Sequence, residues 1–142
     1  MNIAFYVDNP GENDLQKKIF DCLNDAVENF KVEDASLFFE NPTPFSNKAK
    51  FGIFNSTELW AYTGLLISTT LRGTMYAKNI ANKFKLFHLF SSEKDIFSLI
   101  RVGNMAQIIT LSKEDQQEVY RLTGKMPKLV ELKAESLIEA LK

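Results

Sequence analysis

The chain is poor in the residues that build cross-links and metal sites. Its 142 residues include one cysteine, Cys22, and one histidine, His88. A single cysteine cannot form a disulfide within the chain, and this pair cannot supply a zinc-ligand cluster. We therefore expect no metal site and a reducing, cytoplasmic setting.

Long apolar runs and an excess of one charge are missing too. No apolar run reaches the roughly 18 residues of a membrane-spanning helix, and Met1 leads into an expected strand rather than a signal peptide. The 17 Lys and Arg against 18 Asp and Glu give a net charge of −1. That balance lacks the basic excess typical of nucleic-acid-binding proteins. We expect neither a membrane nor a nucleic acid as partner.

Glycine, with six residues, is too sparse for the usual nucleotide-binding loops. A dinucleotide-binding loop needs Gly-x-Gly-x-x-Gly, whereas Gly11 stands alone after the first expected strand. A P-loop pattern is absent, and Asn55 occupies the place where a phospho-acceptor receiver needs Asp. We expect no cofactor.

What the sequence does contain is a regular alternation of short apolar segments and amphipathic ones. Strands are expected over residues 3–7, 37–39, 51–54, 65–69, 85–90, 107–111 and 129–132. Parallel strands need crossovers, and right-handed crossovers place helices on both faces of one sheet. The sequence therefore predicts one α/β domain over 1–142, a doubly wound, mainly parallel Rossmann-like sheet of six to seven strands.

Capping residues mark the expected helix starts. Asp14, Ser92 and Ser112 are expected N-caps, and Ser56 or Thr57 can cap a short helix. Cys22 falls on the apolar side of the first helix, which predicts an unreactive core thiol.

Candidate ligand contacts follow from the rule that open α/β sheets bind ligands beyond the carboxyl ends of their strands. The rule selects loops and not single residues, and the polar residues in these loops give the candidate ligand contacts Asn9, Asn55, Thr69, Thr70, Arg72 and Ser112. Hydroxyls and amides at the start of a helix can hold an anion, and Arg72 can add a forked charge. The alternative is an ordinary Ser/Thr cap with an arginine in solvent.

Two residues are candidates for catalysis, although the sequence leaves the catalytic residues unknown. Asp8 ends the first strand and can act as a base or merely cap the turn. His88 lies within an apolar strand, on the face of Leu86 and Phe90, and can be a base or a hydrogen-bonded structural residue.

The charges are unevenly distributed along the chain. Residues 1–41 carry 3 basic and 9 acidic side chains, whereas residues 42–92 carry 6 and 1. The basic residues of the second segment are Lys48, Lys50, Arg72, Lys78, Lys83 and Lys85. They can attract a phosphorylated ligand or a nucleic acid, meet the acidic first segment or lie in water.

Three aromatic residues lie outside the expected core. Phe45, Trp60 and Tyr62 can cover a surface for a partner chain or a second copy.

The stretches 65–93 and 108–132 resemble the N-terminal half of a glycosyltransferase of the two-Rossmann (GT-B) fold. A strand ending in hydroxyl residues, Ser68-Thr69-Thr70, leads into a helix, and an aromatic-rich strand follows at 85–90. A strand ending at Ser112 then precedes a helix, Gly124 and Pro127. Phage-encoded members are nearest in character.

The resemblance implies the acceptor side of a sugar-transferring enzyme that is not catalytic alone. The family binds its nucleotide-sugar mainly in a second Rossmann domain, so a second chain or a homodimer would have to complete the cleft. Two other interpretations of the function stay open. One is a non-catalytic interaction or scaffold protein, and the other is a small nucleotide- or phosphate-binding domain.

Overall fold

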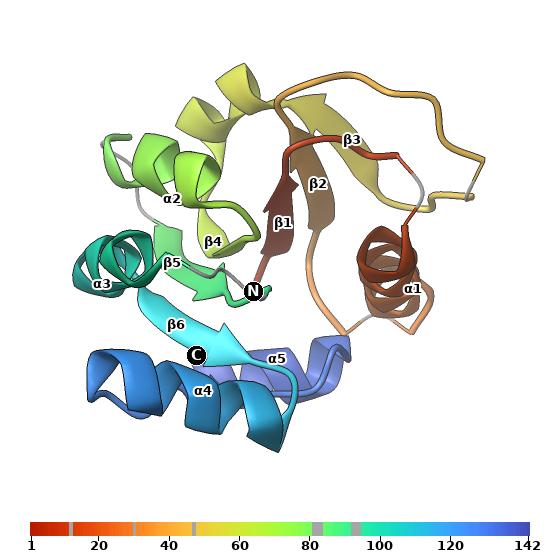
Figure 1. Cartoon of the computed structure of the whole chain (residues 1–142). Coiled ribbons are helices and arrows are strands. Elements are labelled where there is room, and N and C mark those ends of the chain that lie inside the picture. The colour runs from red at the N-terminus through yellow and green to blue at the C-terminus, as the bar shows by residue number, and fades with distance from the viewer. Residues whose placement is uncertain (12, 30, 47, 81–83, 92–94) are drawn as a thin grey trace.

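The computed structural model describes residues 1–11, 13–29, 31–46, 48–80, 84–91 and 95–142, in which a seven-stranded sheet carries helices on both faces (Figure 1). The strands are β1 (Ile3–Val7), β2 (Ala35–Phe39), β3 (Gly52–Asn55), β4 (Gly64–Ser68), β5 (Phe84–Leu89), β6 (Gln107–Thr110) and β7 (Lys128–Leu129). The helices are α1 (Asp14–Glu28), the 3-10 helix η1 (Ser56–Ala61), α2 (Leu71–Lys78), α3 (Ile96–Met105), α4 (Lys113–Thr123) and α5 (Ala134–Leu141).

Every strand pair is parallel, and the strand order is β3-β2-β1-β4-β5-β6-β7. The chain moves outward in one direction from β1 to β3, returns to the centre at β4 and then moves outward the other way. The switch in direction therefore lies between β1 and β4. This is the Rossmann-like order, and the predicted fold class is confirmed.

Successive side chains of a strand point to opposite faces of the sheet, and helices lie on both faces, so the central strands contribute to two apolar layers. Phe5, Leu37 and Ile67 belong to the core that also holds residues of α1 and α5. Tyr6 and Leu66 face the opposite layer, beneath η1 and α2. Leu99, Val102 and Val119 of α3 and α4 form a third apolar cluster with Phe90 and Ile108.

The helix starts differ in detail from the sequence prediction. Asn13, and not Asp14, is the N-cap of α1, because its side chain accepts from the Gln16 amide. Ser92 lies outside the described residues, and the cap of α3 is Asp95, which accepts from the Phe97 amide. Ser112 caps α4 as predicted, by accepting from the Asp115 amide at 3.1 Å.

Three further expectations need correction. The last strand spans only Lys128–Leu129 instead of 129–132. The predicted short helix after β3 is a 3-10 helix. Tyr62 is buried, with 8% of its surface exposed, because its ring packs on Phe38 and its hydroxyl donates to the Leu65 carbonyl at 2.6 Å.

Gly64 holds the start of β4 against β1 in a conformation that other residues rarely adopt. Its φ is 133°, and a Cβ at this position would lie 2.6 Å from the Asn2 carbonyl oxygen. We expect Gly64→Ala to lower the free energy of unfolding by about 2–3 kcal/mol, through backbone strain and this contact. Urea unfolding followed by circular dichroism would measure it. Gly124→Ala is the comparison, because Gly124 also has a positive φ but no heavy atom within 4 Å of its added Cβ. Equal losses in both variants would contradict the role given to the Asn2 contact.

Among the helices within the described residues, none combines the length and apolar character needed to cross a membrane.

Candidate functional site

The exits of β1 and β2, which are neighbouring strands on one side of the switch point, meet around Asp8. The Asn41 side-chain amide donates to Asp8 Oδ1 at 3.0 Å, and the Asn9 amide approaches Oδ2 at 3.4 Å. The backbone carbonyl of Asp8 also accepts from the Glu40 and Asn41 amides, at 3.1 and 2.8 Å. The Asp8 carboxylate is exposed, and these contacts fix its place at the rim of the sheet.

Tyr6 lies in β1, two residues before Asp8, and its side chain links β1 to the end of β2. Its hydroxyl donates to the Glu40 carboxylate, and its ring meets Tyr76 of α2 edge-on at 6.1 Å between centroids. Burial raises the pKa of Tyr6 above its usual range, and the hydrogen bond to Glu40 and the charge of that residue raise it further. The phenol therefore stays protonated and keeps Glu40 as a fixed acceptor.

The exit of β4 lies directly beside the exit of β1. The Thr69 amide and hydroxyl both donate to the Tyr6 carbonyl, at 3.1 and 3.3 Å. Thr70 caps α2 by accepting from the Gly73 amide at 2.9 Å. A Cβ on Gly73 would lie 2.8 Å from Thr70 Oγ1 and 2.9 Å from Ser68 Oγ, so glycine lets α2 begin close against the strand ends.

The structure groups some of the predicted ligand contacts and separates others. Asp8, Asn9, Thr69 and Thr70 lie around the β1 and β4 exits. Asn55 ends β3 and caps η1 through the Thr57 amide at 3.0 Å. Ser112 follows β6, which is separated from β4 by β5, so it is not part of this group. Arg72 is exposed in the first turn of α2.

His88 is fully buried, and the Thr74 hydroxyl lies 2.8 Å from its Nδ1. Its contact with Thr74 of α2 places it on the α2 side of β5, where Leu86 also packs against the cluster that contains Ala77 of α2. A substrate cannot reach the ring in this conformation, so the geometry favours the structural reading over the catalytic one.

The basic residues of the middle segment do not form one surface. Lys50 forms an ion pair with Glu28 of the acidic first segment. For this residue, the alternative in which the two oppositely charged segments meet is confirmed. Lys78 and Lys85 lie at the amino edge, where both line one pocket with the end of α3. Arg72 lies at the opposite, carboxyl edge. Lys48 is exposed, and Lys83 lies outside the described residues.

Two of the three aromatic residues expected at the surface are exposed. Trp60 has 57% of its surface in solvent and Phe45 has 40%, whereas Tyr62 is in the core. Phe54, which the sequence placed on a strand, is also exposed at the carboxyl end of β3.

Sequence reasoning missed Tyr6, Glu40 and Asn41. The exit of β2 follows the same rule as the other strand exits, and Glu40 directly follows Phe39 at the end of that strand. The signal was therefore present, but the contact itself depends on β2 lying next to β1. The apolar run over residues 3–7 gives Tyr6 no sign of a role beyond the core.

The assembled site offers one exposed carboxylate, a second carboxylate fixed by a phenol, side-chain amides and hydroxyls. Within the described ranges, no group of three His, Cys, Asp or Glu could hold a metal ion. The arrangement is suited to hydrogen-bonding a polar ligand and to accepting a proton at Asp8.

Comparison of the chain with protein-family models, with curated proteins and with solved structures finds no match.

Proposed function

We propose that this chain forms the acceptor-binding half of a glycosyltransferase, with the acceptor sugar held at the carboxyl edge beside β1 and β4. The observation that supports it is the exposed Asp8 carboxylate at the switch point, oriented by the amides of Asn9 and Asn41. Sugar hydroxyls both donate and accept hydrogen bonds. A mixture of carboxylate, amide and hydroxyl side chains matches that chemistry.

Asp8 would serve as the base in the transfer. The acceptor hydroxyl oxygen forms a bond to the anomeric carbon of a nucleotide-sugar, while the bond from that carbon to the phosphate breaks. The nucleoside diphosphate leaves, and Asp8 takes the proton of the acceptor hydroxyl. Glu40 stays fixed on Tyr6 and would bind a second sugar hydroxyl.

The donor nucleotide-sugar would be held by a second Rossmann-like unit facing this edge. That unit is a partner chain or a second copy of this one. Phe54, 42% exposed at the carboxyl end of β3, offers it an apolar contact.

A glycan array probed with the fluorescently labelled chain would test acceptor binding without the donor side. We expect the wild-type chain to bind at least one class of glycan. Asp8→Asn should weaken that binding about tenfold, because it removes a charged hydrogen-bond acceptor while keeping the shape of the side chain.

Asp95→Asn is the matched control, because Asp95 is another exposed carboxylate that accepts local hydrogen bonds, at the start of α3. This variant should bind glycans as the wild type does. An array without signal, or equal binding by the Asp8→Asn chain, would contradict the proposal.

A further inference from the structure

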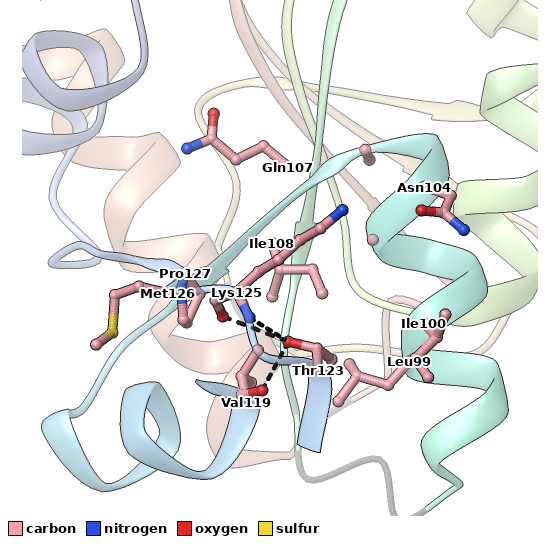
Figure 2. Close-up of a pocket in the computed structure, with 12 residues that line it drawn as sticks. Leu99, Ile100, Asn104, Gln107, Ile108, Val119, Thr123, Lys125, Met126 and Pro127 are labelled. Atoms are coloured by element: carbon pink, nitrogen blue, oxygen red, sulfur yellow. Dashed lines mark hydrogen bonds between the residues drawn. The ribbon is translucent and has the colours of Figure 1, made fainter. Parts of the chain in front are cut away.

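A pocket of about 190 Å³ opens between α3 and α4, at the amino edge of the sheet and thus away from the Asp8 site (Figure 2). Its walls include Leu99 and Ile100 of α3, Ile108 of β6 and Val119 of α4. The space exists partly because Gly103 has no side chain. A Cβ there would meet nothing closer than Ile108 Cδ1, at 3.6 Å.

Three polar side chains line the same pocket. They are Asn104 at the end of α3, Gln107 at the start of β6 and Lys125 after α4. Figure 2 shows the Lys125 side chain extending past Ile108, with its amine directed toward the side where Asn104 and Gln107 lie. Within the described part of the chain, these three side chains make no hydrogen bond or ion pair.

Thr123 differs from these three residues because its hydroxyl is already used. It donates to the Val119 carbonyl at 2.8 Å and accepts from the Lys125 amide at 3.2 Å. Its bonds fix the turn that carries Lys125. The pocket therefore combines an apolar floor, one cation and two uncommitted amides, and the described lining residues include no acid.

We propose that this pocket binds a small amphipathic carboxylate, with an apolar body about the size of one benzene ring. An apolar cavity of about 150 Å³ is enough to take up benzene, so the volume here allows one ring and a short linker. The carboxylate would lie against the Lys125 amine and accept from the side-chain amides of Asn104 and Gln107. The charge of the rim and the apolar floor together select this class over a sugar or an inorganic anion.

The probe is 3-phenylpropionate, followed by methyl ¹H–¹³C NMR of the full chain. We expect saturable shifts of the Leu99, Ile100, Ile108 and Val119 methyl groups, with a dissociation constant on the order of 1 mM. The neutral analogue 3-phenylpropan-1-ol should bind about threefold more weakly, because an exposed ion pair contributes little. Lys125→Met should remove the difference between the two probes.

Gly103→Leu fills the pocket from α3 and should abolish binding of both probes. Arg101→Leu adds the same side chain to an exposed position of α3 outside the pocket and should bind as the wild type does. Thermal unfolding would confirm that both variants are folded. Absence of methyl shifts, or undiminished binding by the Gly103→Leu chain, would overturn the site. Equal binding of both probes by the wild type would overturn the assignment of an anion.

Discussion

Raising the pH from 8 to 11 is expected to lower the free energy of unfolding by about 5–6 kcal/mol. Three buried acids cause this loss. Burial raises the pKa of Cys22 to about 12, with a smaller contribution from the charge of Asp25. Burial also raises the pKa of Tyr6 and that of Tyr62 above the usual tyrosine range, with smaller contributions from Glu40 to Tyr6 and from the charge of Asp34 to Tyr62.

Stability falls as the pH rises because the folded chain holds these three protons more tightly than the unfolded chain does. The folded chain keeps all three acids protonated at a pH at which the unfolded chain has begun to release these protons. Their contribution to stability is therefore complete below the ordinary pKa and is lost as the pH rises above it. Each group lowers the free energy of unfolding by about 1.4 kcal/mol per pH unit. The decline begins at about pH 9 for the thiol and at about pH 10 for the phenols.

Urea unfolding at pH 8, 9, 10 and 11 would measure the decline. Cys22→Ala should remove more than half of the loss between pH 9 and 10, and Tyr62→Phe should reduce the slope above pH 10 by about 1.4 kcal/mol per unit. The same slope in the wild type and in both variants would show that other groups control alkaline unfolding.

Tyr6→Ala is expected to lower the free energy of unfolding by about 3–5 kcal/mol at neutral pH, as for other large buried aromatic side chains. Only 1% of the Tyr6 surface is exposed, and its ring lies between the central strands and α2. Truncation would leave a cavity under Tyr76 and Gly73, because a Cβ on Gly73 would already lie 3.3 Å from Tyr6 Cε2.

Tyr6→Phe separates packing from the hydrogen bond. It keeps the ring and removes only the hydroxyl that donates to the Glu40 carboxylate, so the loss should be about 1.5–3 kcal/mol. Chemical unfolding of both variants in parallel would test this difference. A Tyr6→Ala chain as stable as Tyr6→Phe would mean that the ring does not support the central layer.

The sequence was sufficient for the fold class because the strands are short, apolar and regularly separated by amphipathic helices. Predictions for single residues were wrong where a local sequence pattern is compatible with two structures. Asn13 and Asp14 are both good caps, and the turn geometry selects Asn13. Tyr62 has a polar tip and follows a short helix, but the neighbouring Phe38 ring makes burial favourable.

The candidate site was only partly predictable for a different reason. The rule that ligands bind beyond the carboxyl ends of strands identifies loops only, and the strand order decides which of those loops lie side by side. Asp8 and Thr69 come together because β1 and β4 are neighbours, whereas Ser112 belongs to a strand two places away from β4. Glu40 contacts Tyr6 through the pairing of β2 with β1, which no local pattern reveals.

The proposed acceptor site is tested most directly by titrating the chain with the glycan that the array selects and mapping the backbone amide shifts in the ¹H–¹⁵N spectrum. An acceptor bound at the carboxyl edge should cause the largest shifts around the exits of β1, β2 and β4, at Asp8, Asn9, Glu40, Thr69 and Thr70. Shifts confined to α3, α4 and the start of β6, with the strand exits unchanged, would contradict it.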